Sequence, residues 1–139
     1  MINRLLAAST VLGMVAALAG CNSSASKNKQ YTGPEAAAVV KMQFNTFQPP
    51  TVSIQAGQTV MWNNTSLSWH TVTGDPSKAR EPSRVGLPKG AQPFDSGKME
   101  PGRKFWHTFD VPGIYHYISL PYEEKGMTGM IIVEKVPGS

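Results

Sequence analysis

The chain has 139 residues, of which 40% are hydrophobic and 16% charged, with a formal net charge of +4 at pH 7. These proportions are ordinary for one globular domain and exclude an intrinsically disordered chain. The basic residues are scattered rather than clustered. The charge pattern therefore predicts no nucleic-acid partner and favours a mildly basic, solvated surface.

The first twenty residues read as an export signal. They contain one basic residue, Arg4, and then an apolar run that ends in Leu-Ala-Gly before Cys21. That run is too short for a stable membrane span and is typical of a signal peptide. The sequence LAGC at 18–21 resembles the bacterial lipobox, in which the cysteine becomes a lipid-modified N-terminus. Asn22 replaces the Asp that retains such lipoproteins in the inner membrane, so we expect an outer-membrane anchor facing the periplasm.

Cys21 is the only cysteine of the chain. The alternative is an ordinary secretory signal with a chance cysteine, but a lone cysteine in an exported protein otherwise needs a partner. No thiol remains in residues 22–139, which excludes both an intramolecular disulfide and a thiolate ligand there. We expect a signal peptide at 1–20, a lipidated cysteine with a flexible Ser/Asn/Lys-rich tether at 21–36, and one domain at 37–136.

Short segments with β-branched, aromatic or alternating residues follow one another through the domain, separated by Gly, Pro and Asn turn signals. They predict strands at 39–44, 51–54, 59–63, 70–73, 94–97, 104–109, 114–119 and 130–136. A hairpin turn is expected at 55–58, and a long loop with one helical turn at most is expected between 74 and 93. Seven or eight such strands without an amphipathic helix predict an antiparallel β-sandwich.

The stretch 113–130, GIYHYISLPYEEKGMTGM, joins a strand to a loop with many reactive side chains. The period of two along the strand separates two faces, which carry Tyr115, Tyr117 and Ser119 on one side and Ile114, His116 and Ile118 on the other. The loop adds Tyr122, Glu123, Glu124 and Met127.

This stretch resembles the motif G-x-Y-x-Y-x-C-x-x-H-x-x-x-x-M with which plastocyanin- and azurin-like cupredoxins end, and whose Cys, His and Met bind copper. Ser119 stands at the position of the cysteine, Tyr122 stands at that of the histidine, and Met127 is in register. The resemblance therefore implies a degenerate type I copper site.

Three more segments resemble the same family in the same order: VMWNNTSLSWHTVT at 60–73, FDSG at 94–97 and PGRKFWHTF at 101–109. The first of them places His70 at the family's first copper ligand. The resemblance implies a cupredoxin-like, Greek-key β-sandwich over nearly the whole domain.

The remaining ligand set does not suit a blue copper centre, which needs two imidazoles and a thiolate. His70 and Met127 keep one strong and one weak donor, a reasonable pair for Cu(I). Ser119 offers a neutral hydroxyl, and is not expected to be a ligand. Tyr122 could bind only as a phenolate. Glu123 and Glu124 could donate a carboxylate oxygen, although loop-tip acids are more often merely solvated.

Four other residues are expected to have structural positions rather than to bind metal. His107 lies on a strand that supplies no ligand in the family, so we expect it to be packed. His116 should point away from Ser119, on the opposite face of its strand. Trp69 is expected to shield His70, and Met99 is expected to lie in a turn.

Three functions remain to be distinguished. One is a membrane-anchored, non-blue copper protein for copper handling or electron transfer, with a periplasmic redox or copper-handling partner. The alternative is a metal-free cupredoxin-fold interaction module. A blue copper carrier is contradicted by the missing thiol. Catalysis is not expected, because Ser119 and His70 come with no recognisable orienting carboxylate or oxyanion hole.

Overall fold

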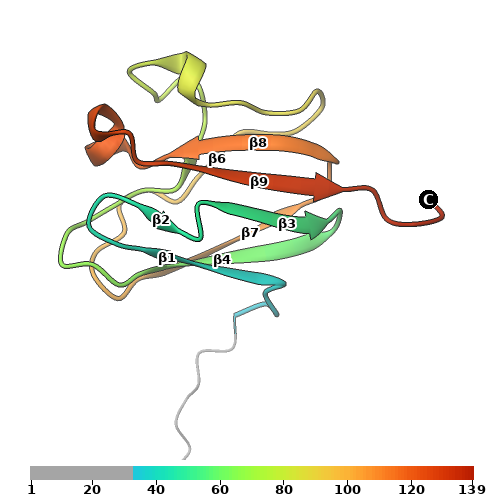
Figure 1. Cartoon of the computed structure of the whole chain (residues 1–139), viewed down its shortest axis with the longest axis horizontal. Coiled ribbons are helices and arrows are strands. Elements are labelled where there is room, and N and C mark those ends of the chain that lie inside the picture. The colour runs from blue at the N-terminus through green and yellow to red at the C-terminus, as the bar shows by residue number, and fades with distance from the viewer. Residues whose placement is uncertain (1–32) are drawn as a thin grey trace, which may run out of the picture. The chain divides into compact units, whose positions relative to one another are not determined.

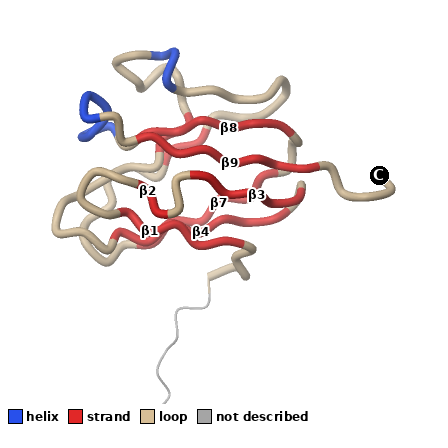
Figure 2. The backbone as a smooth tube through the Cα atoms, in the orientation of Figure 1, coloured by secondary structure: helices blue, strands red, loops and turns tan. Residues whose placement is uncertain are grey.

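The computed structural model describes residues 33–139. The predicted signal peptide, the lipidation site Cys21 and most of the predicted tether lie outside the described residues. Within them the chain forms two β-sheets packed against each other, with two short 3-10 segments in the connections (Figures 1 and 2). None of the helical segments in this part of the chain has the length and apolarity to cross a membrane.

The first sheet has the strand order β2-β1-β4-β7. Its strands are β1 (Ala38–Met42), β2 (Phe47–Gln48), β4 (Gln58–Asn64) and β7 (Lys104–Phe109). The second sheet has the order β3-β9-β8-β5-β6. Its strands are β3 (Thr51–Gln55), β5 (Thr73–Gly74), β6 (Phe94–Asp95), β8 (Gly113–Ile118) and β9 (Thr128–Glu134).

The predicted β-sandwich is confirmed, but its pairing is mixed. β1 runs parallel to β4, and β3 runs parallel to β9. The expectation of wholly antiparallel sheets is therefore wrong for these two pairs. The hairpin expected at 55–58 is also wrong, because β3 and β4 belong to different sheets and the turn carries the chain from one layer to the other. Gly57, at φ +87°, provides the left-handed conformation that this turn needs.

Most strand boundaries were predicted within two residues, and the strand at 104–109 matches β7. The first strand ends at Met42, so Phe44 lies beyond it in a turn and is 63% exposed. β2 was not predicted because two residues carry no periodic signal. The last strand begins at Thr128, two residues earlier than expected. Ile118 is fully buried, although Ile114 and His116 on the same face of the strand are exposed.

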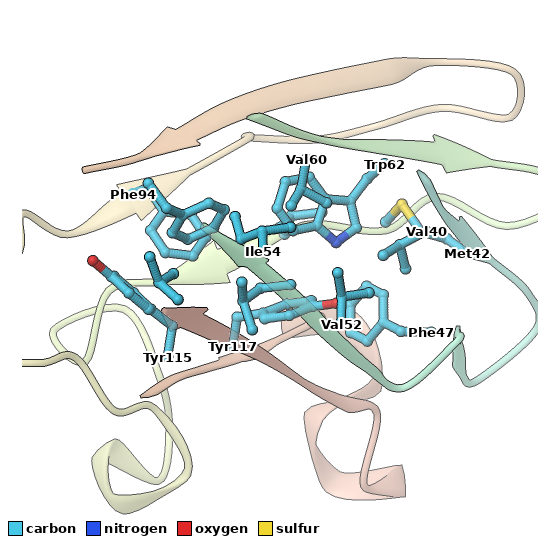
Figure 3. Close-up of a cluster of buried hydrophobic side chains, with 14 of the residues drawn as sticks. Val40, Met42, Phe47, Val52, Ile54, Val60, Trp62, Phe94, Tyr115 and Tyr117 are labelled. Atoms are coloured by element: carbon cyan, nitrogen blue, oxygen red, sulfur yellow. The ribbon is translucent and has the colours of Figure 1, made fainter. Parts of the chain in front are cut away.

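The core between the sheets is rich in aromatic side chains (Figure 3). Trp62 of β4 and Tyr117 of β8 are fully buried, and their rings meet edge to face at 5.5 Å across the interface between the layers. Phe47 packs against Tyr117 on the other side at 4.6 Å. Burial raises the pKa of the Tyr117 hydroxyl far above its usual value, against the opposing effect of the Trp62 side chain. These contacts join the two layers behind the loops that carry the site.

The long connection between β5 and β6 contains one 3-10 turn, η1 (Pro82–Arg84), as the sequence predicted. It folds back onto the second sheet through a backbone bridge, in which Gly86 and His116 exchange hydrogen bonds of 3.2 and 2.9 Å. A side chain at Gly86 would meet the His116 ring at 3.1 Å. The connection is thus attached to β8, the strand that leads into the 119–127 loop.

Candidate functional site

Three connections meet at one end of the sandwich, on the left in Figure 1. The turn after β1 contacts the segment after β4, where the Thr65 amide donates to the Met42 carbonyl at 3.1 Å. The segment η2 (Leu120–Lys125) follows β8 and packs against the same turn, with the rings of Phe44 and Tyr122 at 5.8 Å. The sequence-predicted ligand positions lie in and between these connections.

His70 is fully buried there, and both of its ring nitrogens have polar neighbours. Nδ1 lies 3.2 Å from the Ser119 hydroxyl oxygen, and Nε2 lies 3.0 Å from that of Ser66. His70 and Ser119 are therefore in direct contact.

The surrounding hydrogen bonds determine which nitrogen carries the proton. Ser66 has one hydroxyl proton, and the Asn64 Oδ1 and Ser68 carbonyl oxygens, at 2.8 and 2.9 Å, can only accept it. We therefore assign the His70 proton to Nε2, with the Ser66 hydroxyl as its acceptor. The Nδ1 atom is then unprotonated, and its lone pair faces the Ser119 hydroxyl, which donates to it.

Burial lowers the pKa of His70 below its usual value of 6.5, while the Gln43 carbonyl works weakly in the opposite direction. The ring is consequently neutral at pH 7. A neutral imidazole with an unprotonated Nδ1 is the form that binds a metal ion.

Ser119 is also fully buried, and its hydroxyl oxygen accepts the Thr71 amide at 3.3 Å. Two ligands about 2.1 Å from one metal ion and 120° apart would be separated by about 3.6 Å. The separation of 3.2 Å between Nδ1 and Oγ is that of a direct hydrogen bond instead. Ser119 is therefore a hydrogen-bond partner of His70 in this structure, and the expectation that it is not a ligand stays a prediction.

Tyr122 packs its ring against His70, with centroids 4.9 Å apart and planes inclined at 38°. Phe44 contacts the same ring, and the Lys125 ammonium lies 5.4 Å above it. Tyr122 is partly exposed whereas His70 is not, so the phenol ring separates the imidazole from solvent.

Met127 is 1% exposed and is held by its backbone. Its carbonyl accepts the Ser119 amide at 3.1 Å, and its amide donates to the Tyr122 carbonyl at 3.2 Å. Gly126, at φ +77°, allows the sharp return of the chain that these bonds require. The 119–127 loop is thus closed on itself, and it presents Ser119, Tyr122 and Met127 together.

Glu123 differs from the expectation of a solvated acid. It is 2% exposed, and its two carboxylate oxygens accept the backbone amides of Arg80 and Glu81 at 3.0 and 2.8 Å. The Arg84 guanidinium donates to the Glu123 carbonyl at 2.5 Å. Glu123 therefore fastens the 75–93 connection to the site loop, and its oxygens are engaged. Glu124 is exposed as expected, and forms an ion pair with Arg80.

A chain of hydroxyl groups supports the other side of the loop. The Leu120 amide donates to Thr71 Oγ1 at 2.9 Å, and the buried Thr73 hydroxyl lies 2.8 Å from both Thr71 Oγ1 and Asp95 Oδ1. Desolvation by itself raises the pKa of Asp95, but the bonds from Lys78 and Thr73 outweigh it and hold the pKa below its usual value. The charged Asp95 thereby anchors the threonines next to Ser119.

The remaining candidates separate clearly. His107 packs among Phe94, Phe105 and Phe109, and His116 is exposed on the outer face of β8, both as predicted. Trp69 is 41% exposed and its ring lies 5.4 Å from the Lys98 ammonium, and its shielding of His70 stays a prediction. Met99 does not lie in a free turn: it is 3% exposed, and its backbone pairs with that of His70.

The four residues of the family motif offer one imidazole, one thioether, one hydroxyl and one phenol as possible donors. No group of three or more His, Cys, Asp or Glu side chains able to hold a metal ion occurs within residues 33–139. The set does not fit a trigonal centre of two imidazoles and a thiolate, but its neutral nitrogen and thioether fit a soft, low-coordinate ion such as Cu(I).

Sequence reasoning missed the residues that orient the donors: Asn64, Ser66, Thr71 and Glu123. The run of small polar residues before His70 was the available signal, because Ser and Asn in such runs bind nearby backbone and side-chain groups. The role of Glu123 had no signal, since its partners lie about forty residues earlier in the chain.

Comparison with known proteins places this geometry in a family. A family model described as "Copper binding proteins, plastocyanin/azurin family" matches residues 34–134. A chloroplastic plastocyanin of Tetradesmus obliquus is 32% identical over 88 residues, covering 63% of this chain and 58% of that protein. A halocyanin of Natronomonas pharaonis is 31% identical over 108 residues, covering 74% and 59%. The matches thus span less than two thirds of the length of both relatives.

Solved structures give the same answer for the fold. Amicyanin from Paracoccus versutus superposes with a TM-score of 0.56 at 28% identity, over 74% of this chain and 85% of the amicyanin. A copper-containing nitrite reductase from Thermus scotoductus superposes with a TM-score of 0.56 at 27% identity, over 76% of this chain but only 24% of the reductase chain.

Proposed function

Because the chain belongs to the plastocyanin/azurin family of copper-binding proteins, we propose that it binds copper in a non-blue site built on His70 and Met127. We propose further that Cys21 is lipidated and anchors the protein in the bacterial envelope, on the outer membrane facing the periplasm. There the protein handles copper or transfers electrons with a periplasmic partner protein, and is not an enzyme.

One observation carries the proposal: the buried His70 turns its Nδ1 atom toward the site loop, 3.2 Å from the Ser119 hydroxyl oxygen. The Ser66 hydroxyl holds the opposite nitrogen in its protonated form, and burial keeps the ring neutral. The imidazole is therefore already in the protonation state of a ligand, and binding requires only that the Ser119 hydroxyl release Nδ1. That exchange costs about 1 kcal/mol, the net value of a typical hydrogen bond.

The other residues explain why the site would not be blue. Copper would supply a one-electron redox centre or the transported ion itself, and the protein determines which oxidation state it accepts. Ser119 brings no charge, and Tyr122 fills the place of a second imidazole with a ring that packs on His70. Without a thiolate, neither the colour nor the potential of a blue centre arises, and Cu(I) is favoured over Cu(II).

A second function, a metal-free interaction module, is favoured by a specific observation. His70 and Ser119 satisfy each other, and Thr71, Ser66 and Asn64 complete the hydrogen bonds around them. Such a closed polar network is stable without an ion. In this case the fold would serve binding to a protein partner at the membrane.

Copper titrations of the purified chain distinguish the two functions. Cu(I) is supplied in competition with a chelator, and Cu(II) binding is followed by absorption and electron paramagnetic resonance. We expect stoichiometric Cu(I) binding, with His70→Ala weakening it by about 100-fold or more because the only nitrogen donor is lost. His116→Ala is the matched control, because this exposed histidine lies on the outer face of β8.

Binding that survives His70→Ala would contradict the site. Absence of binding in both oxidation states would make the chain a metal-free member of the family, and would support the second function.

A further inference from the structure

We infer that Met99 supplies a third donor beside His70 and Met127, which makes the site selective for soft monovalent cations, Cu(I) and Ag(I), over Cu(II). This inference rests on the proposed function, since it concerns the same site. The family motif ends with one methionine, Met127, and does not include the segment that contains Met99.

The backbone places Met99 directly opposite His70. The His70 amide donates to the Met99 carbonyl at 3.0 Å, and the Met99 amide donates to the His70 carbonyl at 2.8 Å. This double exchange defines an antiparallel bridge between the two residues. Opposed residues in such a pair project their side chains to the same face, with Cβ atoms about 5 Å apart. The thioether of Met99 and the imidazole of His70 therefore leave the backbone side by side.

The three proposed donor side chains are all buried. His70 is fully buried, Met99 is 3% exposed and Met127 is 1% exposed. Met99 and Met127 belong to one buried cluster of side chains. A flexible thioether of three rotatable bonds can redirect its sulfur within such a cluster without moving its backbone.

The buried side chain of Asn64 forms hydrogen bonds with both the Met99 backbone and the Ser66 hydroxyl that contacts His70. The Asn64 amide donates to the Met99 carbonyl at 2.9 Å, and its oxygen lies 2.8 Å from the Ser66 hydroxyl, which accepts the His70 proton. Asn64 is 1% exposed. The position of Met99 and the tautomer of His70 are thus fixed through one residue.

The chemistry of the set follows from its donors. One neutral imidazole and two thioethers are soft, uncharged ligands, which suit Cu(I) and Ag(I) and leave the charge of a divalent ion uncompensated. The carboxylate of Glu123 is occupied by backbone amides and that of Glu124 by the ion pair with Arg80, so neither loop carboxylate is free to compensate this charge. The site would accordingly take up monovalent ions and reject Cu(II) and Zn²⁺.

The test is Ag(I) and Cu(I) competition titration, together with X-ray absorption spectroscopy to count the sulfur atoms bound to the ion. The variants are Met99→Leu and Met127→Leu, which keep side-chain volume and cost less than about 1.5 kcal/mol of stability. Met130→Leu is the matched control, since Met130 is partly buried on β9 and pairs with His116. Circular dichroism and thermal unfolding establish that each variant is folded.

We expect two bound sulfur atoms in the unmodified chain and one in Met99→Leu, with affinity for Ag(I) and Cu(I) lowered by about 10- to 100-fold. Met130→Leu should change neither quantity. One bound sulfur atom in the unmodified chain, together with full affinity in folded Met99→Leu, would overturn the inference and leave the proposed copper site standing. Failure of the unmodified chain to bind either ion would instead overturn the proposed function, and this inference with it.

Discussion

His70 is a fully buried imidazole and His107 a half-buried one, and their surroundings differ. His70 lies between connections at one end of the sandwich, with a hydroxyl at each nitrogen. His107 lies in β7, stacked on Phe94 at 4.4 Å and edge to face with Phe109 at 4.7 Å. Burial lowers the pKa of both rings. A shared pKa shift therefore does not distinguish a site from a core residue.

The two histidines differ in their hydrogen bonds. Those around His70 are made by Ser66, Asn64, Ser119 and Thr71, which together we call the polar frame. Hydrogen bonds fix the tautomer of His70 and direct one lone pair at a chosen atom, whereas aromatic contacts fix the plane of His107 without assigning a role to either nitrogen. Only the first arrangement prepares a ligand. Substitutions at the ligand positions, in the hydrogen bonds around His70 and at His107 test this comparison.

Restoring the ligands of the family should have the largest effect. The double substitution Ser119→Cys with Tyr122→His adds a thiolate and an imidazole beside His70, and we expect it to bind Cu(II) with the intense blue absorption of a type I centre. Absorption and electron paramagnetic resonance measure the change. Tyr122→His alone is the control and should remain colourless. A colourless double variant in the presence of Cu(II) would count against the alignment of this loop with the family motif.

Breaking the polar frame should destabilise the fold. Ser66→Ala removes the acceptor of His70 Nε2–H and of the Ser68 amide, so we expect the free energy of unfolding to fall by about 1–3 kcal/mol. Urea denaturation measures it. Ser83→Ala is the matched control, because Ser83 is exposed and bonds only the nearby Glu81 carboxylate, and it should change stability by less than about 0.5 kcal/mol. Equal losses in the two variants would refute the frame.

Weakening the attachment of the site loop should have a smaller effect. Glu123→Gln keeps one acceptor oxygen but turns an NH2 group toward the other backbone amide, so we expect a loss of about 1–2 kcal/mol. Hydrogen exchange should increase at Arg80 and Glu81, the two amides that the carboxylate binds. Glu124→Gln, at an exposed ion pair, serves as the comparison and should leave exchange unchanged.

The aromatic environment should tolerate the loss of its imidazole best. His107→Phe preserves the ring packing, so we expect a change within about 1 kcal/mol at neutral pH and unaltered metal binding. The free energy of unfolding should also fall less steeply as the pH is lowered. Both histidines have folded-state pKa values below 6.5, so the unfolded chain binds protons first as the pH falls below about 6.5 and stability is lost.

Removing His107 removes one of these two contributions. Urea denaturation at about pH 7.5 and about pH 5 measures how much unfolding free energy the variant and the unmodified chain each lose. Equal losses would show that folding does not lower the pKa of His107.

Local patterns in the sequence predicted what depends on neighbouring residues. The strand at 104–109, the opposite faces of Tyr117 and His116, and the helical turn in the long connection all follow from periodicity or from Gly and Pro signals. The relation between the sheets could not be read in this way, because the turn at 55–58 looks the same whether its strands pair with each other or with distant partners.

The same limit applies to the site. The motif identified His70, Ser119, Tyr122 and Met127, and the contacts among them agree with that grouping. Whether they bind metal stays a prediction. Glu123 and Met99 were misjudged because their partners, the 75–93 connection and the backbone of His70, are distant in sequence and close only in the folded chain.

The parallel pairing of β3 with β9 also governs how the molecule folds. Thr51 pairs with Met130, so the second sheet cannot be completed until the last strand of the domain is available. The entropy of closing so long a loop is lost before the contacts between β3 and β9 form. Folding on a scale of roughly milliseconds to seconds is therefore expected for this topology. A nascent chain that still lacks β9 leaves β3 without its parallel partner, so the second sheet stays incomplete until Glu134 has been synthesised.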